Sequence, residues 1–481
     1  MALEALEPRS VFHYFEALCA IPHGSGNTRA NRNYCVRFAR ERGLEHYQDD
    51  CNNVIIIAPA TAGYEAAAPL ILQGHLDMVC AAAVDCTADM SKDGLSLFID
   101  GDFIGAEGTS LGGDDGIAVA MILALLDDSS IPHPRIEAVF TADEETGMLG
   151  AASLDVSPLR GRTMLNLDSE EESVFTVACA GGARVQLCWT VEREIITAVP
   201  LTLTISGLVG GHSGTEIDKG RGNANILMGR LLRVLSKRCA LRLCSLSGGT
   251  ADNVIPNACR AELAVSRDDI EAVLSVTETL RRVFREEFSF GDKDISISAA
   301  LEAENSLSVL CAADTQRLLN ALTLVPNGVQ AMNHALPGFP ETSLNLGILN
   351  LDGTEASMLF LIRSSVGSRI RKLADRLHCV AEVCGGTSAV LSEYPAWEYK
   401  ADSPLRERMV RLFKAQYGYE PTVTAIHAGL ECGILAGKLP GLDCVSIGPD
   451  ILDIHSCTER MRISSVQRLW AFLLELLRQS K

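Results

Sequence analysis

The sequence contains two histidines and several carboxylates in short segments that are flanked by glycine or follow apolar runs. These segments read GHLD, GGDDG, TADEETG, NLDSE and DIHSC. Imidazole and carboxylate ligands, with no cysteine among them, suit two zinc-like ions that share one bridging carboxylate. A second glutamate beside a metal-binding glutamate would supply the general base that hydrolysis needs. The pattern therefore indicates a metallohydrolase whose candidate residues are His75, Asp77, Asp114, Glu144, Glu145, Asp168 and His455.

The first two segments each allow a structural alternative. His75 and Asp77 share a face if the segment is extended, so Asp77 could hold the second ring nitrogen of a metal-bound histidine. A surface turn explains an isolated HxD equally well. Asp114 and Asp115 precede a helical pattern, where aspartate often caps a helix. Capping suits Asp115 and leaves Asp114 as the bridging ligand.

The later segments also allow structural alternatives. The adjacent carboxylates of Glu144 and Glu145 repel each other unless a cation or proton compensates them, so one would bind metal while the other activates water. A solvated acidic turn is the alternative. Asp168 follows an apolar run and His455 lies in a polar loop before the last helix, and either alone could be structural. The occurrence of all five segments together predicts a dinuclear site.

The elements around these residues predict an α/β fold. Strands alternating with helices favour a mostly parallel, helix-covered sheet, in which ligands gather beyond the carboxyl ends of the strands. His75, Glu144 and Asp168 all follow predicted strands, so we expect them at one edge of the sheet. The predicted strands are 53–58, 70–73, 136–141 and 163–167, and a helix is predicted over 116–126.

From about residue 180 the pattern changes to the alternation typical of half-buried antiparallel strands. A second strand-helix-strand round follows at about 295–391. The helix-strand alternation returns after Tyr394, in the part that contains His455. We therefore predict a catalytic domain formed by 1–183 and 392–481, with an inserted α+β lid domain at 184–391.

Composition excludes several classes of protein. The net charge of −19 argues against binding to nucleic acid or to an anionic membrane. The longest apolar run, Ile117 to Leu126, is shorter than a membrane span. The amino terminus resembles an amphipathic helix rather than a signal peptide, and sixteen cysteines without a CxxC pair indicate a reducing compartment. We expect a cytoplasmic protein.

The ordered segments resemble the co-catalytic zinc aminoacylase and dipeptidase superfamily and, within it, the aminoacyl-histidine dipeptidase family. Further matching segments span nearly the whole chain: IPHGSGN, GLVGGHSG, NVIP, PGFPETSLNLG, LIRSS and HAGLECG. The resemblance implies the zinc exopeptidase fold, hydrolysis of short peptides such as Xaa-His dipeptides, two divalent ions per chain (zinc, or else manganese or cobalt) and a homodimer.

The resemblance also implies a role for each residue. One ion would be held by His75, Asp114 and Asp168, and the other by Asp114, Glu145 and His455. Glu144 would act as general base and then acid, Asp77 would orient His75, and the peptide bond after Asp114 would be cis. His212 would stabilise the oxyanion from the lid. The substrate's carboxylate end would meet Asn253, Arg363, His427 and Gly429.

Three departures from the family pattern are His23 in place of arginine, Asp115 in place of asparagine, and Cys457-Thr458 after His-Ser. They affect the expected side-chain preference and metal affinity, and none removes a ligand or the base. Two other hydrolases fit the same scaffold, an N-acyl-amino-acid deacylase and a tripeptide aminopeptidase. A non-catalytic binding protein is the alternative from another class, and the retained Glu144 and ligands argue against it.

Overall fold

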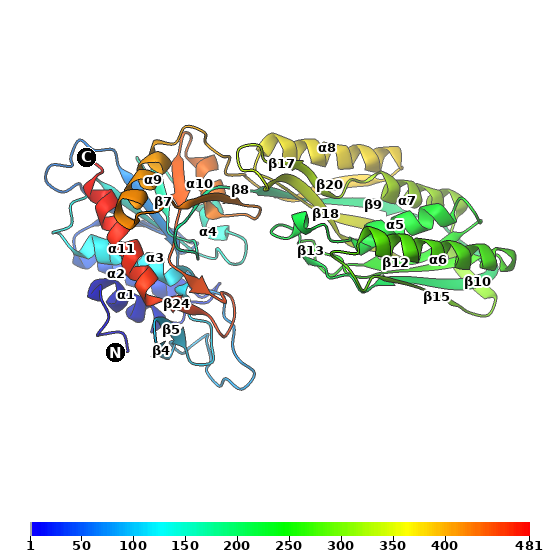
Figure 1. Ribbon diagram of the computed structural model, residues 1–481, viewed down its shortest axis with the longest axis horizontal. Helices are drawn as coiled ribbons and strands as arrows, with labels where there is room; N and C mark the ends of the chain where they lie inside the picture. The colour runs from blue at the N-terminus through cyan, green and yellow to red at the C-terminus, as the bar shows by residue number, and fades with distance from the viewer. Residues whose placement is uncertain (1) are drawn as a thin grey trace. The chain divides into compact units, whose positions relative to one another are not determined.

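The computed structural model describes residues 2–481, which form two compact units (Figure 1). The first unit comprises Met1–Ala178, Tyr399–Ala425 and Leu430–Lys481, so it combines both ends of the chain. The second comprises Cys179–Glu398 and the short segment Ile426–Gly429. Within residues 2–481, no helix is both long and apolar enough to cross a membrane.

Unit 1 is built on an eight-stranded sheet whose order is β1-β2-β6-β3-β7-β22-β8-β21. The four central strands, β6, β3, β7 and β22, run parallel, and antiparallel strands flank them on both sides. The central strands are apolar and fully buried along most of their length, as expected for strands covered on both faces. The strands are β1 Glu45–Gln48, β2 Val54–Ala58, β3 Leu70–His75, β6 Ile136–Thr141, β7 Thr163–Asn166, β8 Val174–Cys179, β21 Thr422–Ile426 and β22 Asp443–Ser446.

The helices of unit 1 pack against this sheet and against each other. Helix α3 is apolar on every side and buried from Gly113 to Leu125, as a helix in the middle of a core must be. It lies so close to β3 that a Cβ on Gly74 would come within 2.6 Å of the Asp115 carboxylate, which requires glycine there. The helices are α1 Arg9–Cys19, α2 Arg29–Glu41, α3 Gly113–Asp127, α4 Leu149–Ser153, α9 Pro404–Tyr417, α10 Glu431–Lys438 and α11 Ile463–Arg478.

A small antiparallel sheet completes unit 1 and joins the last part of the chain to the first. Its order is β23-β24-β5-β4, with β4 Leu97–Asp100, β5 Phe103–Ala106, β23 Ile451–Leu452 and β24 Arg460–Arg462. The loop between β23 and β24 contains His455. Pairing of β24 with β5 therefore holds that loop beside residues from the first quarter of the chain.

Unit 2 is built on a ten-stranded antiparallel sheet in which the same topology occurs twice. One half has the order β15-β10-β14-β12 and the other β20-β9-β19-β18, and β12 pairs with β18 where the halves meet. The strands are β9 Gly181–Thr190, β10 Arg193–Ser206, β12 Arg242–Gly248, β14 Cys259–Val265, β15 Ser296–Leu301, β16 Asn305–Leu310, β17 Gly328–Met332, β18 Pro340–Asp352, β19 Glu355–Ser364 and β20 Thr387–Tyr394.

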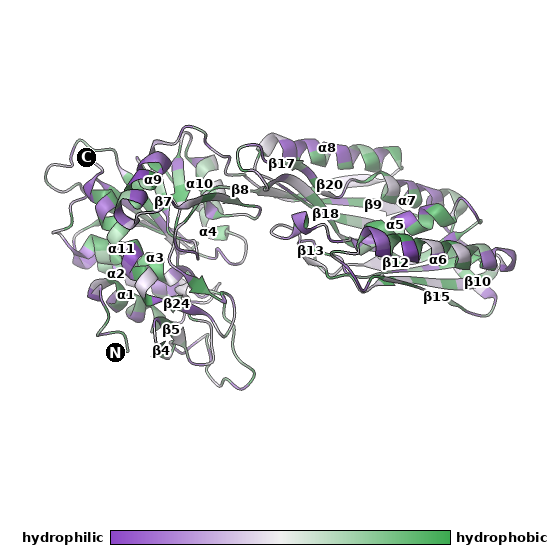
Figure 2. Ribbon diagram, in the orientation of Figure 1, coloured by the Kyte–Doolittle hydropathy of each residue, from purple (hydrophilic) through white to green (hydrophobic). Residues whose placement is uncertain are grey.

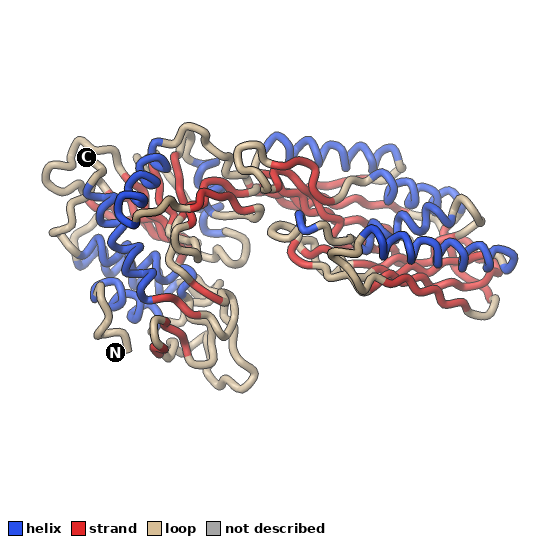
Figure 3. The backbone as a smooth tube through the Cα atoms, in the orientation of Figure 1, coloured by secondary structure: helices blue, strands red, loops and turns tan. Residues whose placement is uncertain are grey.

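Each half of this sheet carries two helices. Helices α5 Ala224–Leu235 and α6 Ile270–Glu287 belong to the first half, and α7 Ala312–Leu324 and α8 Gly367–Val383 to the second. Contacts between neighbours place them in the row α6-α5-α7-α8 over the strands (Figure 3). Hydrophilic and hydrophobic residues alternate along α8, which is buried on one side only (Figure 2). One hydrophobic core runs under all four helices.

The expected fold class is confirmed: unit 1 has a helix-covered, mostly parallel sheet, and unit 2 is antiparallel α+β. The strands predicted at 70–73, 136–141 and 163–167 are β3, β6 and β7. The second strand-helix-strand round was predicted at 295–391, but its bounds differ in the structure. Its first strand, β9, precedes the whole first half in the sequence. The first half is therefore inserted into the second, and the second half is not one continuous stretch of chain.

Candidate active site

The carboxyl ends of three adjacent strands bring together residues that are far apart in the sequence. In the parallel register of β6, β3 and β7, His75 lies opposite Thr141 and Gln73 opposite Asn166. His75 ends β3, Glu144 and Glu145 follow β6, and Asp168 follows β7. These side chains therefore leave the sheet at the same edge, as the sequence predicts.

Asp114 lies between the two histidines. Its Oδ1 is 3.1 Å from His75 Nε2, and its Oδ2 is 3.2 Å from His455 Nε2. Each histidine nitrogen also faces a second carboxylate: Asp168 Oδ1 at 3.3 Å from His75 and Glu145 Oε1 at 2.9 Å from His455. The arrangement consists of two three-residue groups that share the Asp114 carboxylate.

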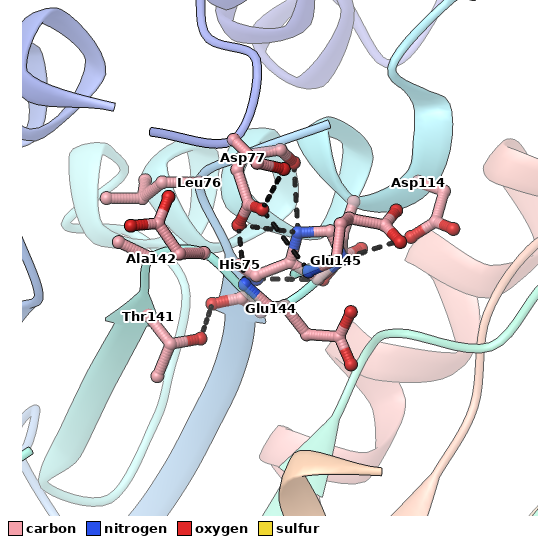
Figure 4. Close-up of polar contacts among 12 residues, drawn as sticks. His75, Leu76, Asp77, Asp114, Thr141, Ala142, Glu144 and Glu145 are labelled. Atoms are coloured by element: carbon pink, nitrogen blue, oxygen red, sulfur yellow. Dashed lines mark hydrogen bonds and ion pairs between the residues drawn. The ribbon is translucent and has the colours of Figure 1, made fainter. Parts of the chain in front are cut away.

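Asp77 has more contacts than the sequence indicated (Figure 4). The backbone carbonyl of Asp77 accepts the hydrogen bond from His75 Nδ1 at 2.9 Å, and its carboxylate lies 3.5 Å from the same nitrogen. The carboxylate accepts the backbone N–H groups of Glu144 at 3.0 Å and Glu145 at 3.3 Å, and the hydroxyl of Ser25 at 2.8 Å. Asp77 therefore fixes both the His75 ring and the loop that carries the two glutamates.

The suggestion that Asp115 caps helix α3 is wrong. The residue before the helix is Gly112, which has no side chain that could cap it, and the backbone angles of Asp114 and Asp115 depart from helical values. Asp115 is buried, and its Oδ2 accepts the backbone N–H of His75 at 3.1 Å. The peptide bond between Asp114 and Asp115 is cis, as the resemblance implied.

The two three-residue groups differ in exposure. The His75 side chain is 1% exposed, whereas the His455 side chain is 45% exposed. His455 has a φ of +59°, in the left-handed region that residues with a side chain rarely adopt. Glu145 Oε1 is buried and, apart from the close His455 nitrogen, has no polar partner among residues 2–481. Such an oxygen is suited to ligating a cation.

The site has an excess of buried carboxyl groups, and their pKa values show it. Burial, together with the charge of neighbouring acids, raises the pKa of Glu144 to about 8 and that of Asp168 to about 7. The same causes raise the pKa of Glu170 to about 8, and burial raises that of Glu431 to about 7. Negative charge at this place is therefore poorly compensated by the protein alone.

The histidines respond in the opposite way. The nearby carboxylates of Asp114 and Glu145 raise the pKa of His455 to about 10. Burial disfavours a charged His75, but the negative charge of Asp168 and the bonds to carboxylates outweigh it and raise the pKa well above its ordinary value. In the absence of cations, protons on the two imidazoles would supply the missing positive charge.

The donor set fits divalent cations. Within residues 2–481, ligand atoms that lie within 4.8 Å of one another occur in the groups His75, Asp114, Glu145 and His75, Asp115, Asp168. The Asp115 carboxylate already accepts the His75 N–H, which leaves Asp114 as the candidate ligand beside His75 and Asp168. Imidazole and carboxylate donors suit zinc, manganese and cobalt alike.

Glu431 is a buried residue of the site that the sequence did not single out. Its Oε2 accepts hydrogen bonds from Gln73 Nε2 at 2.6 Å and Thr141 Oγ1 at 2.5 Å. It thereby ties the start of α10 to the ends of β3 and β6. The segment HAGLECG, in which it stands, matched the family, but no local pattern indicates contacts with residues 290 and 358 positions earlier.

Unit 2 contains a second cluster of predicted residues, gathered around Gly214. A Cβ on Gly214 would lie 2.4 Å from the His427 carbonyl oxygen, 2.9 Å from His212 Cε1 and 3.2 Å from Arg363 Nε. Arg363 is 6% exposed; its guanidinium donates to the Tyr394 hydroxyl at 3.1 Å, and its Nε has no hydrogen-bond partner. A buried guanidinium with an unused donor is suited to binding an anion.

The pKa values of both histidines in this cluster are lowered, which favours their neutral forms. Burial and the charge of Arg363 lower the pKa of His212, and the same causes with His212 lower that of His427 to about 3. His212 Nδ1 accepts the backbone N–H of Thr215 at 3.1 Å, which places the proton of the neutral ring on Nε2. His427 Nε2 bonds to Ser343 Oγ at 2.7 Å. His212 can therefore donate a hydrogen bond from Nε2.

The two remaining predicted residues, Asn253 and Gly429, also belong to unit 2 but show fewer contacts. Strand β11 Gly211–His212 pairs with β13 Val254–Ile255, and the Asn253 carbonyl accepts the N–H of Ser213 at 2.8 Å. Asn253 is exposed. Gly429 belongs to the Ile426–Gly429 segment of unit 2 and is half-buried. Their roles in binding stay predictions.

Comparison with known proteins gives a consistent result. Residues 203–292 match the M20 peptidase dimerisation domain. The chain is 35% identical to the cytosol non-specific dipeptidase of Escherichia coli over 479 residues, which cover 99% of both chains. Such identity over the whole length of both proteins is a family relationship.

Comparison with solved structures supports the same family relationship. The aminoacylhistidine dipeptidase of Vibrio alginolyticus superposes with a TM-score of 0.94 at 35% identity, covering 99% of this chain and 98% of the other. The aminopeptidase PepT of Bacillus cereus superposes with a TM-score of 0.55 at 15% identity over 99% of both chains, which shows the shared fold alone.

Proposed function

Since the chain belongs to the M20 peptidases and, among them, to the family of the cytosol non-specific dipeptidase, we propose that it is a dipeptidase that uses two divalent cations. The observation that carries the proposal is the Asp114 carboxylate, which offers one oxygen to the His75 side and the other to the His455 side. A single shared carboxylate with one histidine and one further acid on each side is the arrangement that a dinuclear site needs.

We assign one ion to His75, Asp114 and Asp168 and the other to Asp114, Glu145 and His455. Such cations, when bound, lower the pKa of water and polarise the scissile carbonyl. The assignment is supported by the raised pKa of the buried carboxyls, because two cations would compensate their charge. Zinc, manganese and cobalt all suit these ligands.

Glu144 is assigned the proton transfers. Its carboxylate would take a proton from the attacking water and deliver it to the leaving amine. Without cations its pKa is about 8, mainly because of burial, and nearby positive charge would lower that value toward the range of a base at neutral pH. The Asp77 carboxylate holds the Glu144 backbone in place, so Asp77 orients both the base and His75.

Unit 2 is assigned the roles of lid and dimerisation domain. The match of residues 203–292 to a dimerisation domain supports a homodimer. His212 would donate from Nε2 to the oxyanion, which its tautomer and lowered pKa allow. Arg363 would bind the carboxylate end of the substrate with Asn253, His427 and Gly429. Recognition of that end would limit the substrates to short peptides.

Xaa-His dipeptides are the substrates that we favour, because the Vibrio alginolyticus relative is an aminoacylhistidine dipeptidase. A cytoplasmic location is proposed from the cytosol non-specific dipeptidase of Escherichia coli. An N-acyl-amino-acid deacylase or a tripeptide aminopeptidase would use the same cations, and only substrates separate these activities from the proposed one.

The test is hydrolysis of a small panel by metal-stripped protein and by protein reloaded with zinc or manganese. The panel holds Xaa-His dipeptides, neutral dipeptides, a tripeptide and an N-acetyl amino acid. We expect cation-dependent cleavage of the dipeptides. Glu144→Gln should lower kcat by about 10²- to 10⁴-fold with the bound cations retained, while the exposed Glu171→Gln serves as control. Cleavage of the acetylated compound alone, or wild-type turnover by Glu144→Gln, would overturn the proposal.

A further inference from the structure

Glu459 is a buried carboxylate that accepts hydrogen bonds from four consecutive backbone N–H groups. Its side chain is 4% exposed. Oε2 accepts from the N–H groups of Leu111 at 2.9 Å and Gly112 at 3.1 Å, and Oε1 from those of Gly113 at 2.9 Å and Asp114 at 3.4 Å. The fourth donor is the backbone N–H of Asp114, whose carboxylate lies between His75 and His455.

These four N–H groups would otherwise have no partner. Leu111 and Gly112 precede α3, and Gly113 and Asp114 are its first two residues, so the helix itself offers none of these four N–H groups an acceptor. Asp115, the local candidate for this role, bonds instead to His75. Glu459 therefore does from a distant segment what a capping side chain usually does locally, and its negative charge suits the positive end of the helix.

The segment that contributes Glu459 also contributes a ligand. His455 stands four residues before Glu459, and the Glu459 N–H donates to the Ser456 carbonyl at 3.2 Å, which closes the loop between them. His455 and Asp114 are 341 residues apart in the sequence and come together at 3.2 Å. The Glu459 carboxylate thus fastens the loop of Asp114 to the loop of His455.

We propose that Glu459 is a positioning residue of the dinuclear centre, holding the Asp114 and His455 loops at the separation that the shared carboxylate requires. The inference rests on the proposed function, because it assumes that the two groups bind cations. Glu459 would not touch the substrate or the cations; it would act on affinity and geometry through the backbone of 111–114.

Glu137 offers a matched control elsewhere in unit 1. It is also a fully buried carboxylate that accepts backbone N–H groups, from Arg160 and Gly161 at 2.9 Å each, and it pairs with Arg135 at 2.8 Å. It holds the turn before β7 and contacts none of the proposed ligands. Glu137→Gln therefore disturbs a similar set of bonds without disturbing the centre.

The experiment measures cation binding by the full chain, through competition with a chromophoric chelator and through the visible absorption of bound cobalt. In Glu459→Gln, whichever way the amide turns, its NH₂ group faces two N–H donors. We expect this variant to bind cations about 10- to 100-fold more weakly, the usual effect of losing a residue that orients ligands, and to change the cobalt spectrum. Glu459→Asp should recover part of the loss, and Glu137→Gln should bind as the wild type does.

Thermal unfolding of the metal-free proteins separates positioning from stability alone. Weaker cation binding in Glu459→Gln, with an unfolding midpoint similar to that of Glu137→Gln, would support the proposal. Unchanged affinity and cobalt spectrum in a folded Glu459→Gln would overturn it. If that variant does not fold, the affinity of Glu459→Asp decides in the same way. A wild type that binds no cations would overturn the proposed function itself, which is a distinguishable result.

Discussion

The two clusters of candidate residues have opposite charge and opposite pKa shifts. In unit 1 the acids outnumber the histidines, so burial and mutual repulsion raise the pKa of Glu144 and Asp168. In unit 2, burial and the guanidinium of Arg363, which pairs with no carboxylate among residues 2–481, lower the pKa of His212 and His427. The first cluster lacks positive charge, and the second lacks negative charge.

The difference indicates what each cluster would bind. Cations would complete the first, and an anion would complete the second. A dipeptide has a carboxylate next to the scissile bond, so it offers a partner for an arginine while its carbonyl requires activation by cations. Neutralising one cluster at a time tests which ligand each cluster binds.

The largest effect is expected from Asp114→Asn. The amide supplies one neutral oxygen where both groups need a charged one, so we expect fewer than about one cation per chain and a fall in kcat/KM of about 10³-fold or more, because a bound cation contributes several kcal/mol. Metal content by mass spectrometry and the dipeptide assay measure it. The exposed Asp85→Asn is the control. Two retained cations with normal activity would refute the shared-ligand assignment.

The second-largest effect is expected from removing the guanidinium proposed to bind the substrate carboxylate. Loss of the buried guanidinium in Arg363→Ala should reduce kcat/KM for a dipeptide by about 30-fold or more, which corresponds to about 2 kcal/mol or more for a truncated buried pair. The same dipeptide as a C-terminal amide should lose little. Arg363→Lys should lie between them, because lysine keeps the charge without the fork. An equal loss for acid and amide would show that Arg363 does not bind the carboxylate, and the exposed Arg371→Ala controls for charge.

The smallest effect is a pH dependence of stability. Folding lowers the pKa of His427 from its ordinary 6.5 to about 3, so the folded state binds fewer protons than the unfolded state between these values. The stabilisation is present above pH 6.5 and is lost as pH falls toward 3, by at most about 1.4 kcal/mol per pH unit. His427→Gln should flatten this slope in denaturant unfolding of metal-free protein at pH 4.5 to 6.5. An unchanged slope would mean that His427 titrates normally.

Much of the first cluster could be predicted because its candidate ligands stand at the ends of recognisable strands. His75, Glu144 and Asp168 follow the apolar runs that form β3, β6 and β7, and parallel strands place their carboxyl ends together. The order of the segments then supplied Asp114 and His455. Helix boundaries were also close: the helix predicted over 116–126 lies within α3, Gly113–Asp127.

What could not be predicted depends on contacts between distant residues. Nothing local distinguishes Glu459 from any solvated glutamate after a polar loop, and its four partners lie about 345 residues earlier. Tyr394 beside Arg363 is hidden for the same reason. Asp115 was misjudged because local propensity favours a cap, whereas the close approach of α3 to β3 makes the His75 N–H its nearer donor.

The pairing of β12 with β18 makes the joined sheet of unit 2 independent of protein concentration. The two βαββαβ halves of unit 2 are covalently joined, so the association that merges their sheets is unimolecular and does not weaken as the protein concentration falls. It also removes two strand edges, since the continuous path ends only at β15 and β20. Unpaired edges invite aggregation, and a chain that seals two of its own carries that risk at fewer places.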